Sequence, residues 1–221
     1  MVNRIALWFA LASLVFAACT ALAPARGTTE RGRVVFFGDS ITANWPNVMP
    51  TFFAQHGYLG RGISGQTTVQ MLERFDRDVI DAKPSVVVIL AGTNDIAESN
   101  PPYDDAPIRA NLRTMTERAQ AHGVRVVLAS LLPARDYPWR HGLDPAMRIV
   151  ALNAWIKEYA ARVGAIYLDY FGAMVDARNG LRASLGRDAV HPNLAGYQVM
   201  APLAQQAVEA ALASPVRPEG R

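Results

Sequence analysis

The chain has 221 residues, of which 51% are hydrophobic and 19% charged, so it can bury a core and does not have the composition of a disordered protein. Its net charge of +3 is small and its lysines and arginines are scattered, which argues against nucleic-acid binding. Because there is a single cysteine, no disulfide can form within the chain and the core alone must hold the fold.

Residues 1–18 have the pattern of an export signal. Arg4 precedes an uncharged stretch that ends at residue 18, is apolar except for Ser13, and is too short for a spanning helix. Cys19 follows directly and resembles the acylated cysteine of bacterial lipoproteins, although Phe16 stands where leucine is usual. The alternative is an ordinary signal cleaved after Ala25. We favour lipidation at Cys19.

Beyond the signal, strand and helix patterns alternate without a repeat or an internal linker. Short apolar, mostly β-branched runs predict strands at residues 34–37, 57–60, 85–90, 124–129 and 165–168. Apolar residues three or four apart predict helices around residues 108–119, 149–163 and 197–208. Strand–helix alternation predicts right-handed crossovers and a parallel sheet covered on both faces.

We therefore expect an α/β fold: a single doubly wound, three-layer α/β/α domain over residues 33–215, with a mostly parallel sheet of about five strands. Residues 19–32, rich in Ala, Pro, Gly and Thr, are expected to form a flexible tether, and residues 216–221 a C-terminal tail.

Four short blocks along this domain carry the chemistry, namely Gly38-Asp39-Ser40, Gly65, Gly92-Thr93-Asn94-Asp95 and Asp188-Ala189-Val190-His191-Pro192. They supply a hydroxyl nucleophile, two candidate oxyanion donors, and a base with an orienting carboxylate. Each block follows a predicted strand or precedes a helix, so the topology brings all of them to the carboxyl edge of the sheet. Together they are the parts that a serine esterase needs.

The order and the residues of these blocks resemble the motifs of the SGNH, or GDSL, hydrolase family. The family's named residues match Ser40 in VVFFGDSIT, Gly65 in GRGISGQTT, Asn94 in LAGTND and His191 in DAVHPN. The resemblance runs from about residue 33 to the last helix. It implies a flavodoxin-like fold and an exported bacterial esterase or acylhydrolase.

In this interpretation Ser40, His191 and Asp188 form the catalytic triad. Asp188 lies three residues before His191, where one turn brings its carboxylate to the imidazole. The oxyanion hole combines the backbone N–H groups of Ser40 and Gly65 with the side-chain amide of Asn94.

Other residues of the same types have competing interpretations. Asp169 also ends a strand and is the rival of Asp188 as the partner of the base. Asp39 and Asp95 are expected to anchor loops through backbone N–H groups. Three further histidines, each followed by glycine in a polar connection, are expected to be surface residues, namely His56, His122 and His141.

Two motifs could indicate a cofactor. Gly60, Gly62 and Gly65 match the Gly-x-Gly-x-x-Gly pattern of dinucleotide-binding proteins, but the strand before them is weak. The next strong strand ends at Asp95, too far on to supply the ribose-binding acid expected about 20 residues later. An Asp-x-x-His pair can bind metal, but the usual Cys or His cluster is absent. We expect neither a cofactor nor a metal.

The predicted function is hydrolysis of a carboxylic ester through an acyl-enzyme. The resemblance and the export signal imply short acyl groups, such as acetyl, on carbohydrates, with small-molecule or polysaccharide esters as substrates. Lipase, arylesterase, lysophospholipase-like or thioesterase activity, and O-acyl transfer by the same triad, remain open. We expect a monomer in the periplasm, the cell envelope or the medium, in contact with a membrane only through a lipid on Cys19.

Two aromatic features could bear on the substrate. Residues 132–141 follow a strand end and are expected to overhang the site, where Tyr137 and Trp139 either contact the substrate or pack within their own loop. Trp45 is expected to be part of the wall or the core.

Overall fold

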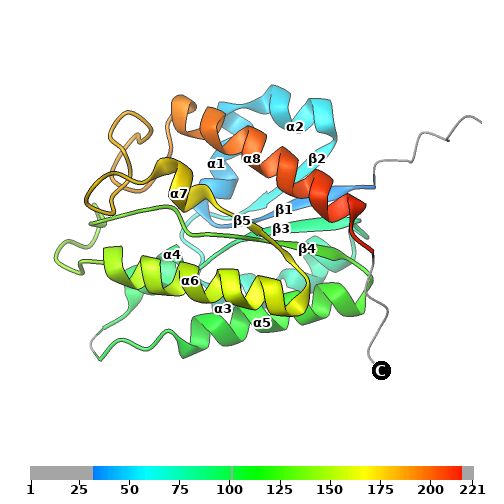
Figure 1. Cartoon of the computed structure of the whole chain (residues 1–221), viewed down its shortest axis with the longest axis horizontal. Helices are drawn as coiled ribbons and strands as arrows, with labels where there is room; N and C mark the ends of the chain where they lie inside the picture. Colours follow the sequence, from blue (N-terminus) through cyan, green and yellow to red (C-terminus); the bar gives the residue numbers. More distant parts are fainter. Residues whose placement is uncertain (1–31, 101, 216–221) are drawn as a thin grey trace, which may run out of the picture. The chain divides into compact units, whose positions relative to one another are not determined.

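The computed structural model describes residues 32–100 and 102–215; the export segment, Cys19, most of the tether and the tail lie outside the described residues. Five strands form one parallel sheet in the order β2-β1-β3-β4-β5 (Figure 1). Their bounds are β1 Val34–Gly38, β2 Tyr58–Gly62, β3 Val86–Leu90, β4 Arg125–Ala129 and β5 Ile166–Leu168. This order is that of flavodoxin-like folds, so the predicted fold class is confirmed, and the sheet is parallel throughout.

Helices cover both faces of the sheet, as Figure 1 shows. One face carries α1 (Ser40–Val48), α2 (Pro50–His56), α7 (Tyr170–Met174) and α8 (Leu194–Ala213). The other carries α3 (Thr68–Glu73), a π-helical turn at Asp76–Ile80, α4 (Thr93–Glu98), α5 (Ala106–Ala121) and α6 (Ala146–Val163). The three helices predicted from periodicity are α5, α6 and α8.

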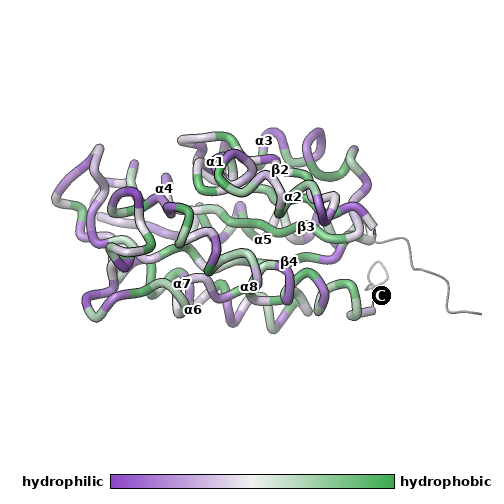
Figure 2. The backbone as a smooth tube through the Cα atoms, turned by 90° about the horizontal axis from the view of Figure 1, so that it is seen from above, coloured by the Kyte–Doolittle hydropathy of each residue, from purple (hydrophilic) through white to green (hydrophobic). Residues whose placement is uncertain are grey.

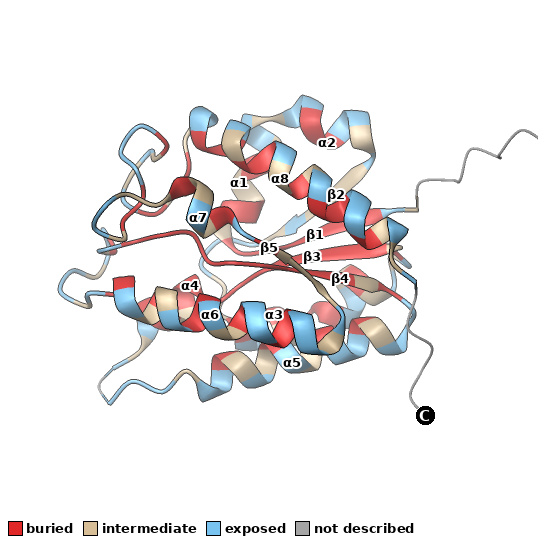
Figure 3. Cartoon of the chain, in the orientation of Figure 1, coloured by how far each residue is buried: buried red, intermediate tan, exposed pale blue. Residues whose placement is uncertain are grey.

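Side chains of each strand alternate between two cores, because successive residues of a strand point to opposite faces. In β1, Val35 and Phe37 join the core under α3 to α6, whereas Val34 and Phe36 join the core under α1, α2, α7 and α8. Trp45 is buried in the second core. The central strands are buried on both faces, which explains their continuous apolar runs (Figure 3).

The parallel register places the carboxyl ends of all strands at one edge. Gly38, the last residue of β1, is level with Gly62 of β2 and Leu90 of β3, so the segments after these strands begin side by side. The loops at this edge, on the left of Figure 2, are mostly hydrophilic. None of the described helices is long and apolar enough to cross a membrane.

Candidate active site

Ser40, His191 and Asp188 meet at the carboxyl edge of the sheet. Ser40 begins α1 directly after β1, and its Oγ lies 3.0 Å from His191 Nε2. On the other side of the ring, His191 Nδ1 lies 2.9 Å from Asp188 Oδ2. With a hydrogen on Nδ1 facing Asp188, Nε2 is free to accept the hydroxyl hydrogen of Ser40. The arrangement can therefore move a proton from hydroxyl to imidazole.

The loop that carries His191 is closed by its own hydrogen bonds. The N–H of Arg187 donates to the carbonyl of His191, 2.8 Å away, and Asn193 caps α8 through Gly196 N–H while its amide donates to the carbonyls of Ser184 and Gly186. These contacts hold the imidazole ahead of α8, where it meets the nucleophile from another part of the chain.

Asp188 is an ionised carboxylate at neutral pH. Partial burial opposes its ionisation, but hydrogen bonds from the N–H groups of His191 and Val190 and from the His191 ring outweigh this and hold the pKa of Asp188 below its ordinary value. An ionised partner fixes the imidazole tautomer and stabilises the imidazolium that a proton transfer creates.

The rival residues lie elsewhere. Asp169 is exposed and caps α7, since its carboxylate accepts from Gly172 N–H at 2.8 Å. His122 and His141 are exposed as predicted, and His56 is partly buried against Phe52. The structure thus pairs Asp188, and not Asp169, with the histidine next to Ser40.

Gly65 and Asn94 lie on two loops that touch. Asn94, in the first turn of α4, donates from Nδ2 to the carbonyl of Gln66, 2.9 Å away. Gly65 has φ +78°, a left-handed conformation that favours glycine, and a Cβ there would meet no atom within 4 Å. Thr67 N–H donates to Gln70 Oε1 at 2.9 Å, which caps the start of α3.

The two aspartates beside these blocks hold loops, as predicted. Asp95 accepts from the N–H of Thr68 at 2.9 Å and also from its hydroxyl, which fixes α4 to the start of α3. Asp39 accepts from Ile41 N–H at 2.9 Å and is almost completely buried. Burial raises the pKa of Asp39 to about 7.

A cleft of about 550 Å³ opens at these residues. It is lined by Ser40, Asn44, Ser64, Gly65, Asn94, Glu98, Trp139, Arg187 and His191. Apart from one tryptophan the lining is polar or glycine, and none of these side chains is aliphatic. The cleft therefore has an aromatic wall but no aliphatic one.

Trp139 forms the aromatic part of that lining. Its indole is half exposed, and its ring centre lies 5.8 Å from that of His191. The next residue, Arg140, donates to the carbonyl of Ala97 at 2.6 Å and to Asn100 Oδ1, which ties this loop to the end of α4. The Trp139 loop therefore overhangs the site and is anchored there by Arg140.

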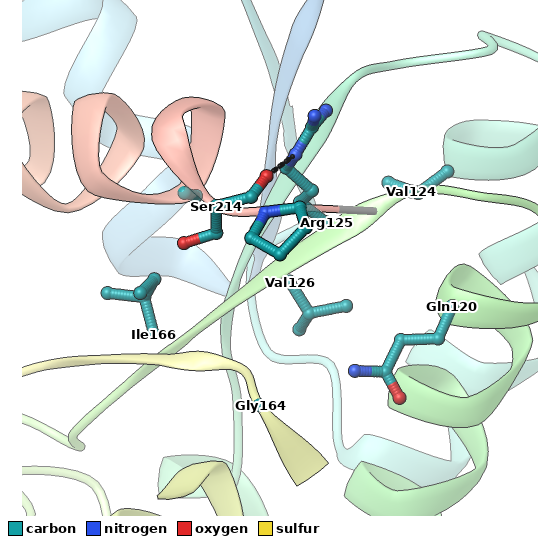
Figure 4. A pocket seen from close by; sticks show the side chains of 9 residues that line it. Gln120, Val124, Arg125, Val126, Gly164, Ile166 and Ser214 are labelled. Atoms are coloured by element: carbon teal, nitrogen blue, oxygen red, sulfur yellow. Dashed lines mark hydrogen bonds between the residues drawn. The ribbon is translucent and has the colours of Figure 1, made fainter. Parts of the chain in front are cut away.

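A second cavity, of about 30 Å³, lies near the amino ends of β4 and β5 (Figure 4). A volume of this size has room for only about one or two water molecules. Across this cavity, Arg125 Nε donates to the carbonyl of Ser214 at 2.8 Å. Gln120 and Ile166 are also among the residues that line it. Its size and its distance along the strands from Ser40 make the larger cleft the candidate site.

Several lining residues were not singled out by the sequence. Asn44, Glu98 and Arg187 lie one to four residues from motif positions in the chain, and this closeness is the signal that could have found them. Within residues 32–100 and 102–215, no group of three or more His, Cys, Asp or Glu side chains is placed to hold a metal ion.

A parallel α/β sheet with a serine, a histidine and an aspartate at its carboxyl edge is the arrangement of an α/β serine hydrolase. Residues 36–199 match the model of the GDSL-like Lipase/Acylhydrolase family, and the chain belongs to this family. It is a carboxylic ester hydrolase. A solved GDSL-like lipase from Bacteroides thetaiotaomicron shares 42% identity and a TM-score of 0.79, over 85% of this chain and 92% of that one.

Curated relatives are more distant. The chain is 26% identical to esterase TesA of Pseudomonas aeruginosa over 83% of this chain and 90% of that protein, and 25% identical to an acetylxylan esterase of Geobacillus stearothermophilus over 65% and 68%. It is 34% identical to the uncharacterized lipoprotein YqeF of Bacillus subtilis, a match that spans 50% of this chain and 52% of that protein.

Proposed function

We propose that the protein hydrolyses short-acyl esters, such as acetyl esters of carbohydrates, through a covalent acyl-enzyme on Ser40. The observation that supports this most is the continuous contact from Ser40 Oγ through the His191 ring to Asp188, at 3.0 and 2.9 Å. A serine hydroxyl is a weak nucleophile at neutral pH unless a base lies within hydrogen-bond reach, and here one does.

The reaction takes two steps. Ser40 Oγ attacks the ester carbonyl while His191 Nε2 takes its proton; His191 then protonates the departing alcohol, which leaves the acyl group on the serine. Water then attacks the acyl carbonyl while His191 removes its proton. When the bond between the acyl carbon and Ser40 Oγ breaks, His191 returns this proton to Ser40 Oγ, and the carboxylic acid leaves. Asp188 remains ionised throughout and stabilises the imidazolium in both steps.

The oxyanion of each tetrahedral intermediate is held by the N–H groups of Ser40 and Gly65 and by the amide of Asn94. Ser40 is the first residue of a helix, so its N–H has no acceptor within that helix. Asn94 Nδ2 carries two hydrogens; one goes to the carbonyl of Gln66, and the second serves the oxyanion. Such donors stabilise the transition state most when they are fixed in advance.

The lining of the cleft supports the choice of substrate. A long acyl chain requires an apolar wall, and none of the lining side chains is aliphatic. Because His191 delivers the proton to the leaving alcohol, Trp139 beside it faces the alcohol part of the ester. An indole face with Glu98 and Arg187 nearby suits the apolar faces and hydroxyl groups of a sugar. Similarity to an acetylxylan esterase is a further argument.

Export through residues 1–18 and lipidation of Cys19 form part of this proposal. Both lie outside the described residues, and they are supported by the sequence pattern and by a relative whose name is lipoprotein. The substrate is then an ester outside the cytoplasm.

The test is an activity panel. Esters with acyl chains from acetyl to palmitoyl, including acetylated xylan, pectin and sialic acid, should show highest kcat/KM for acetyl groups on sugars. A serine-directed fluorophosphonate should label Ser40 alone, and Ser40→Ala should keep, at most, a residual rate about 1,000- to 10,000-fold above water. Preference for palmitoyl esters would contradict the substrate, and near-normal turnover in Ser40→Ala would contradict the mechanism.

A further inference from the structure

Arg74, the residue that ends α3, is a buried cation close to the candidate site. Only 5% of its surface is exposed, and its guanidinium lies 4.2 Å from the centre of the Phe37 ring. It forms an ion pair of 2.8 Å with Asp78. Burying a charge is costly unless its donors are satisfied, so the remaining partners of this group show which parts of the fold it joins.

Those partners belong to segments that surround the nucleophile. Nη2 donates to the carbonyl of Gly38, two residues before Ser40, at 2.9 Å. Nη1 donates to the carbonyl of Arg61 at the end of β2, also at 2.9 Å, and Nε donates to the side chain of Gln66. One guanidinium therefore joins the ends of β1 and β2 to the loop that carries Gly65.

Gln66 continues this link to the second oxyanion donor. Its side chain accepts from Arg74, and its backbone carbonyl accepts from Asn94 Nδ2 at 2.9 Å. Gly38 closes the link on the other side, since its carbonyl also accepts from Ile63 N–H at 3.1 Å. The contacts run without a gap from the turn before Ser40 to the amide of Asn94.

We propose that Arg74 is a positioning residue for the oxyanion hole, which acts through Gln66 to hold the Gly65 N–H and the Asn94 amide at a fixed distance from Ser40. The inference rests on the proposed roles of Ser40, Gly65 and Asn94. Lysine cannot replace arginine here, because the four acceptors around Arg74 outnumber the three donors of an ammonium and match the planar fork of a guanidinium.

A positioning role predicts a change in kcat that a role in fold stability alone does not predict. An oxyanion hole binds the transition state more tightly than the substrate, so displacing it lowers kcat and leaves KM nearly unchanged. A displacement of about 1 Å at a reacting group can cost about 100-fold in rate. A residue that only stabilised the fold would lower the amount of folded enzyme and not its kcat.

The experiment compares Arg74→Lys and Gln66→Ala with the parent on phenyl acetate, using fluorophosphonate titration to count active sites. Gln66→Ala keeps the backbone carbonyl that holds Asn94 but removes its connection to Arg74. We expect kcat per titrated site to fall about 10- to 100-fold in both variants, with KM changed by less than about threefold. The matched control is Arg77→Lys, which should behave as the parent, because Arg77 is an exposed neighbour that pairs with Asp78 at the surface.

A double-mutant cycle tests whether Arg74 affects catalysis through the oxyanion donors. If Arg74 acts through the oxyanion donors, adding Arg74→Lys or Gln66→Ala to Asn94→Ala should cost clearly less than the product of the separate losses. If Arg74→Lys does not fold, Gln66→Ala alone decides the question.

Unchanged kcat per site, a loss confined to KM, or full additivity with Asn94→Ala would each overturn the positioning role. Unchanged kcat in Asn94→Ala itself would instead overturn the proposed function of Asn94, and the inference would fall with it. The two failures are therefore distinguishable.

Discussion

The proposed role of Asn94 would distinguish this site from hydrolases whose oxyanion holes use backbone donors alone. We expect Asn94→Ala to reduce kcat about 100- to 1,000-fold with little change in KM, because the amide hydrogen bond strengthens as the carbonyl becomes an oxyanion. Asn94→Asp should be at least as harmful, since it places a negative charge beside a developing one. Steady-state kinetics on a small ester measure both, with the exposed Asn47→Ala as the control. A large rise in KM at unchanged kcat would show that Asn94 only binds substrate.

Trp139 provides a separate test of the alcohol side of the substrate. An aromatic contact contributes about 0.5–1.5 kcal/mol, so Trp139→Ala should lower kcat/KM on acetylated xylo-oligosaccharides about 2- to 10-fold. Methyl acetate, whose alcohol is too small to reach the indole, should be hydrolysed as by the parent. Trp139→Phe, which keeps a ring, should lie between the two. An equal loss on both substrates would mean that Trp139 supports His191 and does not bind the sugar.

At the scale of elements, we expect the protonation of Asp39, the residue that caps α1, to make the stability of the fold depend on pH. Its carboxylate caps α1 through Ile41 N–H, and burial raises its pKa from 3.8 to about 7. The folded protein therefore keeps a proton that the unfolded chain releases. The contribution of this bound proton to the free energy of unfolding is therefore fully present below pH 4, and it is lost as the pH rises through 7.

Asp39→Asn should remove that pH dependence, because the amide oxygen still caps the helix but cannot ionise. Urea unfolding at pH 5 and pH 8 should show a smaller drop in the free energy of unfolding for Asp39→Asn than for the parent. Asp39→Ala, which also loses the cap, should be about 1 kcal/mol less stable at pH 5. If the parent and Asp39→Asn lose the same stability between pH 5 and pH 8, then Asp39 is ionised throughout this range.

The length and the burial of a strand or helix decide whether its sequence pattern can be recognised. The central strands β1, β3 and β4 are mostly apolar runs because both faces of the sheet are covered there, and α5, α6 and α8 are long enough to show a helical period. The short helices α2, α4 and α7 have only five to seven residues and show no such period. The sequence therefore predicted the sheet and the long helices but not these short ones.

The candidate site also contains residues that the sequence reveals and contacts that it does not. Ser40, Gly65, Asn94 and the Asp188–His191 pair were visible because each lies in a local motif. The contacts of Arg74 with three separate segments, and the anchoring of the Trp139 loop by Arg140, join residues 8 to 43 positions apart. Such contacts depend on the folded arrangement, and no local pattern in a single sequence encodes them.

At the scale of the whole molecule, the chemistry and the proposed anchor occupy separate parts of the chain. All residues assigned to the site lie between Gly38 and His191, and the family model matches residues 36–199. The proposed signal and Cys19 precede this range. Activity on a soluble ester should therefore be independent of how the N-terminal segment is processed, whereas the location of the enzyme should depend on it.

Cys19→Ser tests this separation. Produced as the full chain in a bacterial host, the parent should be found in the membrane fraction, because several acyl chains on one cysteine anchor a protein far more firmly than the single chain that gives only marginal binding. Cys19→Ser should appear in the soluble periplasmic fraction or the medium, with unchanged kcat on phenyl acetate. Metabolic labelling with a radioactive fatty acid should mark the parent alone. If both forms fractionate alike and neither is labelled, the N-terminus is an ordinary cleaved signal, and the enzyme works free of the membrane.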